Sequence, residues 1–135
     1  FSDEPYCHMS WAGPHRSILA EPGMMDQCVG AYTFSKSYSM SGWRLGFAVA
    51  APATVQAIGK MTNTSLSCVP PFVQLAGAAA LTHDAAERDD AMRKFRAKVE
   101  RLVGELQNVD GVTCPMPAGT FYAFPNVKPI CDRLG

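Results

Sequence analysis

Two apolar runs with a polar segment between them place the strongest constraint on the fold of this chain. Residues 27–34 (QCVGAYTF) are rich in β-favouring side chains, and residues 45–50 (LGFAVA) form a short apolar run typical of a buried strand. The segment between them is polar, and Gly42 within it marks a turn. Two such strands need a sheet, so an all-helical fold is excluded.

Three further segments are predicted to be helices. Residues 52–61 begin with Pro52, which is tolerated in a first turn, and residues 71–81 are rich in Ala and predict a buried, closely packed helix. In the third helix Asp84 is the predicted N-cap, and Glu87 lies three positions later, as in a capping box. The apolar stripe of this helix consists of Met92, Phe95, Val99, Leu102, Val103 and Leu106.

The residues beyond Gly111 are predicted to return to extended structure. Residues 112–114 and 120–124 favour two short strands around a Pro- and Gly-rich turn at 115–119. Strands mixed with helices in this way indicate an α/β chain. Its 135 residues are enough for one modest core.

Composition excludes several functional classes. The formal net charge is zero, which gives no electrostatic case for nucleic acid or an anionic membrane surface, and no apolar run has the length of a membrane span. The five cysteines form no CxxC pair, which favours free thiols in a reducing compartment and so a cytoplasmic protein. The three histidines are not spaced as metal ligands, so no metal site is expected.

The polar segment between the two predicted strands carries the candidate chemistry. Lys36 follows a strand end, the hydroxyls of Thr33 and Ser35 flank it, and Arg44 stands at the start of the next strand. Ligands of open α/β sheets bind in crevices at such strand ends. A phosphate there would accept hydrogen bonds from the hydroxyls and a bidentate contact from Arg44. The amine of Lys36 is suited to form an imine.

This segment resembles the lysine signature of the class I and II aminotransferases, which are fold-type-I enzymes dependent on pyridoxal 5'-phosphate (PLP). Ser35-Lys36 and residues 42–46 (GWRLG) match that signature, while Thr33 stands where the family usually has Ser or Gly. The resemblance implies that Lys36 holds PLP as a Schiff base. It also implies that Thr33, Ser35 and Arg44 bind the phosphate.

The resemblance extends to both ends of the chain. Asp3 and Tyr6 match an Asp-x-x-Tyr segment, which implies that Asp3 pairs with the pyridine nitrogen and Tyr6 with the phenolic oxygen of PLP. Pro5 is unusual between them. Residues 117–125 (PAGTFYAFP) resemble a small-domain segment to which no direct catalytic role is assigned.

The family resemblance implies a partial α/β architecture of the PLP-transferase type. Residues 1–83 would be part of the large PLP-binding domain with its mixed sheet, and residues 84–135 a long connecting helix and the start of a small α+β domain. We expect a fragment, because the family's Gly-rich phosphate cradle would precede residue 1 and its substrate-carboxylate arginine would follow residue 135. The isolated fragment is therefore expected to lack some of the site and to be inactive if those parts are essential.

The predicted function is amino-group transfer between an amino acid and a 2-oxo acid, by a cytoplasmic homodimer. Two alternatives remain open at this point. Another fold-type-I PLP enzyme (a lyase, synthase or decarboxylase) would carry the same lysine segment. A truncated, non-catalytic interaction module would also retain it.

Overall fold

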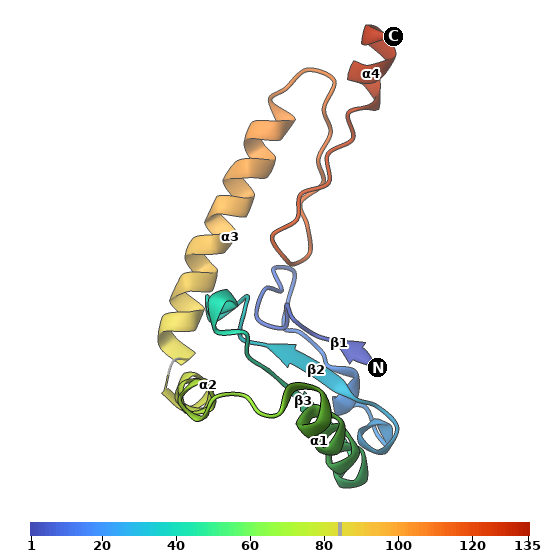
Figure 1. The fold of residues 1–135 in the computed structure, drawn as a ribbon. Helices are drawn as coiled ribbons and strands as arrows, with labels where there is room; N and C mark the ends of the chain where they lie inside the picture. The colour runs from blue at the N-terminus through green and yellow to red at the C-terminus, as the bar shows by residue number, and fades with distance from the viewer. Residues whose placement is uncertain (84) are drawn as a thin grey trace.

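A small mixed sheet forms the base of the molecule in the computed structural model, which describes residues 1–83 and 85–135 (Figure 1). The strands are β1 (Ser2–Asp3), β2 (Gly30–Thr33) and β3 (Gly46–Val49), in the order β1-β2-β3. β1 runs parallel to β2, and β3 runs antiparallel to it. The predicted α/β class and mixed sheet are therefore confirmed.

The strand directions bring three segments to one edge of the sheet. Asp3 pairs with Ala31, and Thr33 pairs with Gly46. β1 and β2 thus end on the side where β3 begins. Chain leaving β1 and β2 and chain entering β3 must meet at this edge, which we call the strand-end edge.

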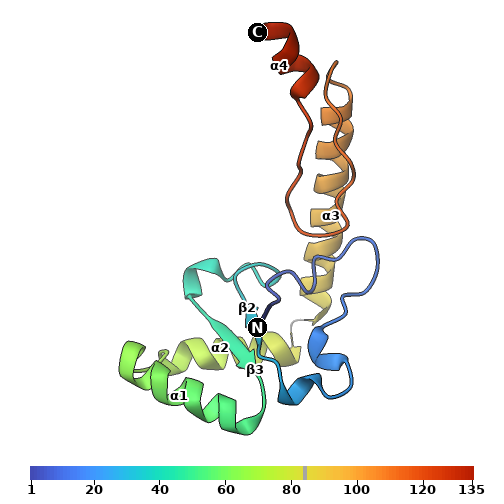
Figure 2. The same ribbon diagram turned by 90° about the vertical axis from the view of Figure 1, so that its right-hand side faces the viewer.

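The helices follow the sequence pattern closely. They are α1 (Pro52–Leu66), α2 (Pro71–His83), α3 (Ala85–Gln107) and α4 (Lys128–Leu134), with 3₁₀ turns at Ile18–Ala20, Met24–Asp26 and Ser41–Trp43. The three predicted helices are confirmed, and α1 continues beyond the predicted end at residue 61. The N-cap predicted at Asp84 lies outside the described residues. Figure 2 shows α3 rising away from the sheet, with the following segment alongside it.

The two strands predicted between residues 112 and 124 do not form. The backbone of Thr113 instead makes one isolated antiparallel bridge with Asn126, and Gly119 makes another with Ser10. The prolines at 115, 117 and 125 flank the two predicted strands, and because proline has no N–H, neither strand can extend its ladder past them.

The buried side chains of the described residues form three clusters. Met9, Trp11 and Met92 make one, Phe34, Leu45 and Val73 a second, and Val99, Val103 and Cys114 a third. The first cluster joins the chain after β1 to α3. The second joins the β2–β3 loop to α2, so α2 and α3 both pack beside the strand-end edge.

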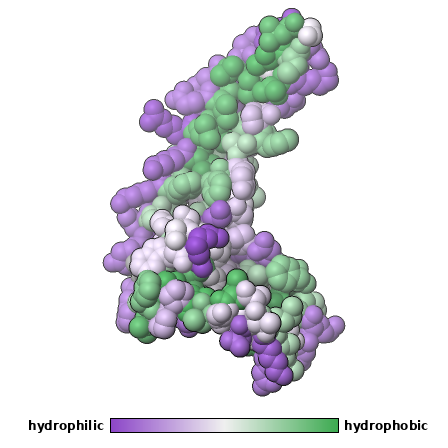
Figure 3. All heavy atoms as spheres, viewed as in Figure 1, coloured by the Kyte–Doolittle hydropathy of each residue, from purple (hydrophilic) through white to green (hydrophobic). Residues whose placement is uncertain are grey.

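Two elements predicted to be buried are largely exposed. β3 is an edge strand of the described sheet, and Phe47 on it is exposed. α2 buries Val73 and Gly77 but exposes Phe72 and Leu75. Figure 3 likewise shows hydrophobic residues reaching the surface at both ends of the molecule. Among the described residues, no helix combines the length and apolar character needed to span a bilayer.

Candidate active site

The loop that joins β2 to β3, residues 34–45, carries the predicted lysine and is closed at its base by its own backbone. The N–H of Phe34 donates to the carbonyl of Leu45 (3.2 Å), and the N–H of Met40 donates to the carbonyl of Phe34 (3.2 Å). Phe34 and Leu45 are buried against Val73 of α2. The two ends of this lysine loop are thus held by the core, and of its polar residues Ser37 is buried while Ser39 and Ser41 are exposed.

The hydroxyls predicted to bind phosphate are linked to each other at the start of the lysine loop. Thr33 Oγ1 lies 3.0 Å from Ser35 Oγ and accepts a hydrogen bond from the Ser35 N–H (3.1 Å). Thr33 pairs with Gly46 at the end of β2, so its backbone is fixed. The pair therefore presents two positioned hydroxyls directly before Lys36.

The side chain of Lys36 lies against aromatic rings from both ends of the chain. Its Nζ is 5.8 Å from the centre of the Tyr6 ring and 5.3 Å from the centre of the Phe121 ring. An open pocket of about 500 Å³ surrounds it, lined also by Ser35, Ser39, Ser41 and residues of α3. The ammonium is therefore held over rings, where a cation is favoured.

Asp3 and Tyr6 line a neighbouring pocket of about 300 Å³ at the end of β1. Met9 lines both this pocket and that of Lys36, so the two are adjacent. The structure thus brings together Asp3, Tyr6 and Lys36 at the strand-end edge. Asp3 itself is exposed.

Arg44 is the predicted site residue that the structure does not bring to these pockets. Its backbone has a left-handed conformation (φ 52°), and its Nη1 donates to the carbonyl of Ser41 (2.8 Å) within its own turn. It lines neither the Lys36 pocket nor the Asp3 pocket. The guanidinium is therefore directed at its own 3₁₀ turn in this conformation.

A buried carboxylate lies between Asp3 and Tyr6. Glu4 accepts hydrogen bonds from Ser2 Oγ (3.0 Å) and Ser17 Oγ (2.7 Å), and its other oxygen lies 2.9 Å from His15 Nε2. Burial alone would raise the pKa of Glu4, but these partners outweigh it and lower the pKa to about 2. The ionised Glu4 fixes the backbone on either side of it.

Two aromatic residues of this site were not predicted from the sequence. Phe121 stands beside Lys36, and Tyr122 Oη lies 3.1 Å from Tyr6 Oη. Both come from the segment to which no direct role was assigned. The only local signal was the adjacent aromatic pair itself, which does not reveal a contact with residues near the N-terminus.

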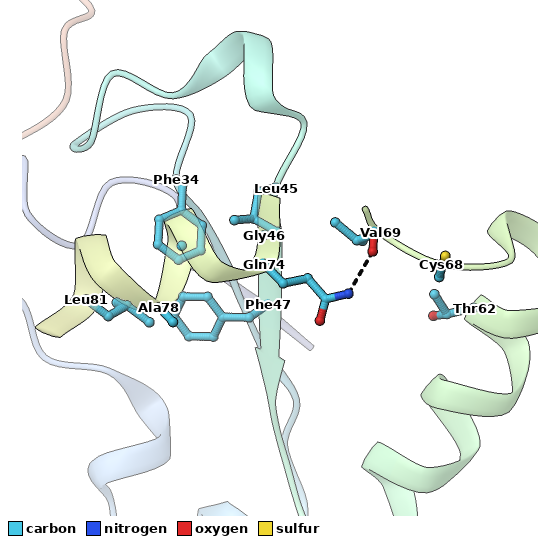
Figure 4. A pocket seen from close by; sticks show the side chains of 11 residues that line it. Phe34, Leu45, Gly46, Phe47, Thr62, Cys68, Val69, Gln74, Ala78 and Leu81 are labelled. Carbon is cyan, nitrogen blue, oxygen red and sulfur yellow. Dashed lines mark hydrogen bonds between the residues drawn. The ribbon is translucent and has the colours of Figure 1, made fainter. Parts of the chain in front are cut away.

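An apolar pocket lies elsewhere, between β3, α2 and the end of α1 (Figure 4). Phe34, Phe47 and Leu81 line it, and Gln74 closes one side by donating to the Val69 carbonyl (2.7 Å). None of the predicted site residues lines it. In the described part of the chain, no group of three His, Cys, Asp or Glu side chains is arranged to hold a metal ion.

A lysine loop at the edge of a mixed sheet, opposite an acidic strand end, places the chain in the PLP-transferase class of α/β proteins. The profile of the family described as "Aminotransferase class I and II" matches residues 1–133, and the chain belongs to that family. Aminotransferases of this family depend on PLP.

Individual relatives agree with this assignment. The chain is 35% identical over 127 residues to an aspartate aminotransferase of Musicola paradisiaca, covering 93% of this chain and 32% of that protein. It superposes with a TM-score of 0.85 on an aspartate aminotransferase of Rhizobium meliloti, at 26% identity, covering 94% of this chain and 32% of that one.

A second solved structure, an aromatic aminotransferase from Pyrococcus horikoshii, gives a TM-score of 0.81 at 33% identity and covers 92% of this chain and 34% of that one. The chain thus spans about a third of the length of the relatives that it matches.

The residues present fit PLP as a ligand. The cofactor carries an aldehyde, a phosphate, a phenolic oxygen and a pyridine nitrogen. The strand-end edge offers an amine at Lys36, paired hydroxyls at Thr33 and Ser35, a phenol at Tyr6 and a carboxylate at Asp3. The donor set therefore matches the cofactor group by group.

Proposed function

We propose that this chain provides the cofactor-binding part of a PLP-dependent aminotransferase that moves an amino group between an amino acid and a 2-oxo acid. The observation that carries the proposal is the amine of Lys36, 5.8 Å from the Tyr6 ring, beside the pocket that Asp3 lines. An amine, a phenol and a carboxylate converge there from two loops at one sheet edge.

Each residue of the proposed site has a role that follows from its chemistry. Lys36 holds the cofactor covalently, and Thr33 and Ser35 donate their hydroxyls to the phosphate. Arg44 completes the phosphate site once its side chain leaves the Ser41 carbonyl, because a guanidinium pairs well with phosphate. Asp3 holds a proton on the pyridine nitrogen, and Tyr6 donates to the phenolic oxygen.

When bound, PLP supplies an electron sink for the carbanion that forms at the substrate α-carbon. Once the substrate amine has taken its place, Lys36 Nζ would accept the proton from that carbon and would deliver it to the carbon derived from the cofactor's aldehyde. Positioned proton transfer of this kind contributes about 10²- to 10⁴-fold in rate. The Tyr6 and Phe121 rings keep Nζ close to the site during that step.

The proposal also covers the domain organisation, the amino donor and the assembly. Residues 1–83 belong to a large PLP-binding domain, and residues 84–135 lead into a small one. Aspartate is the first donor to test, because several relatives are aspartate aminotransferases. A cytoplasmic homodimer is proposed as the assembly, and the exposed apolar side chains of α1 and α2, such as Met61 and Phe72, support association with further polypeptide.

The test is covalent capture of the cofactor. Purified protein is mixed with PLP, reduced with borohydride and digested, and we expect the cofactor on the Lys36 peptide by mass spectrometry. Lys36→Ala should abolish the modification, while Lys60→Ala, on exposed α1, should leave it intact. Absence of PLP from Lys36 in the intact protein would overturn the proposal.

Transfer of isotopically labelled nitrogen from aspartate to 2-oxoglutarate tests the reaction itself. We expect labelled glutamate from the intact protein and none from Lys36→Ala. PLP on Lys36 without transfer to any 2-oxo acid would favour a lyase, synthase or decarboxylase instead.

A further inference from the structure

We propose that Tyr122 is a positioning residue for the cofactor site, acting through the hydroxyl of Tyr6. The proposal deepens the function given above and rests on it for the role of Tyr6. It concerns a residue in the segment to which the sequence assigned no direct role.

The hydroxyls of Tyr6 and Tyr122 are in contact although the two residues are 116 positions apart in the sequence. Tyr6 Oη and Tyr122 Oη are 3.1 Å apart, within hydrogen-bond range, and the rings meet edge to face with centres 6.0 Å apart. Phe121 packs against both, at 5.5 Å from the Tyr6 ring and 4.6 Å from the Tyr122 ring. We call Tyr6, Phe121 and Tyr122 the aromatic triad.

Backbone and side-chain hydrogen bonds hold Tyr122 in this place. The Thr120 N–H donates to the carbonyl of Met9 (2.7 Å), and the Trp11 indole N–H donates to the carbonyl of Thr120 (2.7 Å). The Met9 N–H in turn donates to the carbonyl of Tyr6 (2.8 Å). These hydrogen bonds connect Thr120, close to Tyr122, to Met9, and Met9 to Tyr6. Because hydrogen bonds are directional, they fix the position of one backbone segment relative to the other.

Burial does not account for the position of Tyr122. Its side chain is 60% exposed, so little apolar area would be lost if the ring moved away. Phe124, two residues on, is 91% exposed and makes no comparable contact. The feature specific to Tyr122 is its hydroxyl and the partner that this hydroxyl finds.

The chemistry of two phenols explains what such a contact does. A phenol has one O–H to donate and lone pairs with which to accept. When the cofactor offers its phenolic oxygen as an acceptor, Tyr122 donates to Tyr6 and the O–H of Tyr6 is turned toward that oxygen. Hydrogen bonds in series polarise and strengthen one another. Tyr122 thereby sets the direction and strength of the donor at Tyr6.

The surroundings of Tyr6 also keep it protonated, as a donor must be. In the cofactor-free protein Tyr6 donates to Tyr122, and this hydrogen bond, which only the neutral phenol can donate, is the main cause that raises the pKa of Tyr6. Burial and the charge of Asp3 raise it further. Lys36 Nζ lies 5.8 Å from the Tyr6 ring, on the side that Phe121 also lines. The amine thus lies over the ring of the donor, in a pocket adjacent to the one that Tyr6 lines.

The first test needs no cofactor. Tyrosine ionisation is followed by ultraviolet absorbance in the cofactor-free protein, in the wild type and in Tyr122→Phe, Tyr6→Phe and Tyr38→Phe. We expect Tyr6 to ionise at lower pH in Tyr122→Phe, which keeps the ring and removes only the hydroxyl. Tyr38→Phe, whose hydroxyl lies in another cluster, should leave the ionisation of Tyr6 unchanged. An unchanged Tyr6 titration in Tyr122→Phe would overturn the proposal, whether or not the protein binds PLP.

The second test is a double-mutant cycle on PLP affinity in the intact protein. Tyr122→Phe should weaken PLP binding by about 2- to 10-fold, because the hydrogen bond between Tyr122 and Tyr6 is lost. In the Tyr6→Phe background the same substitution should have no further effect, because Tyr122 acts through Tyr6. Equal losses in both backgrounds would mean that Tyr122 acts independently, contrary to the proposal. Failure of every variant, wild type included, to bind PLP would instead contradict the proposed function.

Discussion

The ammonium of Lys36 lies 5.3 Å from the centre of the Phe121 ring, on a segment that leaves the far end of α3 and returns to the sheet. Gly119 makes the bridge with Ser10 that fixes this return. The lysine loop is therefore positioned in part by residues from the second half of the chain. A site with a local sequence motif thus depends on a long-range contact.

Replacing Phe121 with leucine should speed the attachment of PLP to Lys36, because the neutral amine attacks the aldehyde while the ring stabilises the ammonium. A cation over an aromatic ring gains about 0.5–1 kcal/mol at an exposed site, so the loss of the ring corresponds to about a two- to fivefold faster reaction. Rapid mixing with PLP, followed by its absorbance, measures the rate. Phe124→Leu is the matched control, since Phe124 is almost fully exposed, and should react like the wild type. Equal rates in all three proteins would show that the ring does not stabilise the ammonium.

Local sequence patterns predicted most of the fold but not the contacts that complete the site. Helices α1, α2 and α3 and the lysine loop follow from periodicity, capping and turn residues, which are properties of neighbouring residues. Tyr122 meets Tyr6 only because two distant segments share an edge of the sheet. Nothing in the residues near either tyrosine specifies that pairing.

Two of the wrong predictions share a physical cause, which is that β-structure depends on partners. Residues 120–124 have β-favouring side chains, but Gly119 pairs with Ser10 and Thr113 with Asn126, so no ladder extends through them. Residues 45–50 were expected to be buried as a uniformly apolar run. In the described sheet β3 is an edge strand, and Gly46, Phe47 and Ala48 on it are exposed.

Arg88 should stabilise the protein by attaching the lysine loop to the first turns of α3. Its Nη1 donates to Tyr38 Oη (3.2 Å), its side chain is only 16% exposed, and the His8 ring meets the other side of Tyr38 edge-on. Arg88→Met should therefore lower the free energy of unfolding by about 0.5–1.5 kcal/mol, measured by urea denaturation. Arg93→Met, on the exposed side of the same helix, should change it by less than about 0.5 kcal/mol.

The Arg88 prediction can be separated from general damage to the helix by a double-mutant cycle with Tyr38→Phe. If the two side chains stabilise the protein through one hydrogen bond, the second substitution should cost less once the first is present. Purely additive effects would contradict the contact.

Glu4 should make stability depend on pH in the acid range. Its pKa is about 2 in the folded protein and 4.5 ordinarily, so the unfolded chain binds the proton more tightly. The stability that Glu4 contributes is therefore fully present above pH 4.5 and is lost as the pH falls toward 2. Urea denaturation between pH 7 and pH 3 measures this loss.

Glu4→Gln should remove that dependence and destabilise the protein near neutral pH. The neutral amide weakens charge-assisted hydrogen bonds from Ser2, Ser17 and His15, each worth about 1.5–3 kcal/mol. Its stability should fall less steeply with acid than that of the wild type. Glu105→Gln, on the exposed face of α3, should keep the wild-type slope. An identical acid slope in Glu4→Gln and wild type would show that another group is responsible.

Two helical glycines should respond oppositely to the same substitution, because only one of them lies at a packed interface. A Cβ at Gly77 of α2 would meet the Leu45 side chain and lie 3.2 Å from Phe34 Cζ, in the cluster that holds the ends of the lysine loop. A Cβ at Gly59 of α1 would meet nothing within 4 Å. Gly77→Ala should thus destabilise by about 1–3 kcal/mol through overpacking. Gly59→Ala should stabilise by up to about 1 kcal/mol through helix propensity.

Thermal and urea unfolding of the two glycine variants, side by side, give the comparison. Because both substitutions add one methyl group inside a helix, their difference isolates the contact of α2 with Phe34 and Leu45. If Gly77→Ala also slows PLP attachment to Lys36 while Gly59→Ala does not, then the packing of α2 against the base of the lysine loop affects the position of Lys36. Equal stabilisation by both substitutions would mean that α2 does not pack closely on Phe34 and Leu45 in solution.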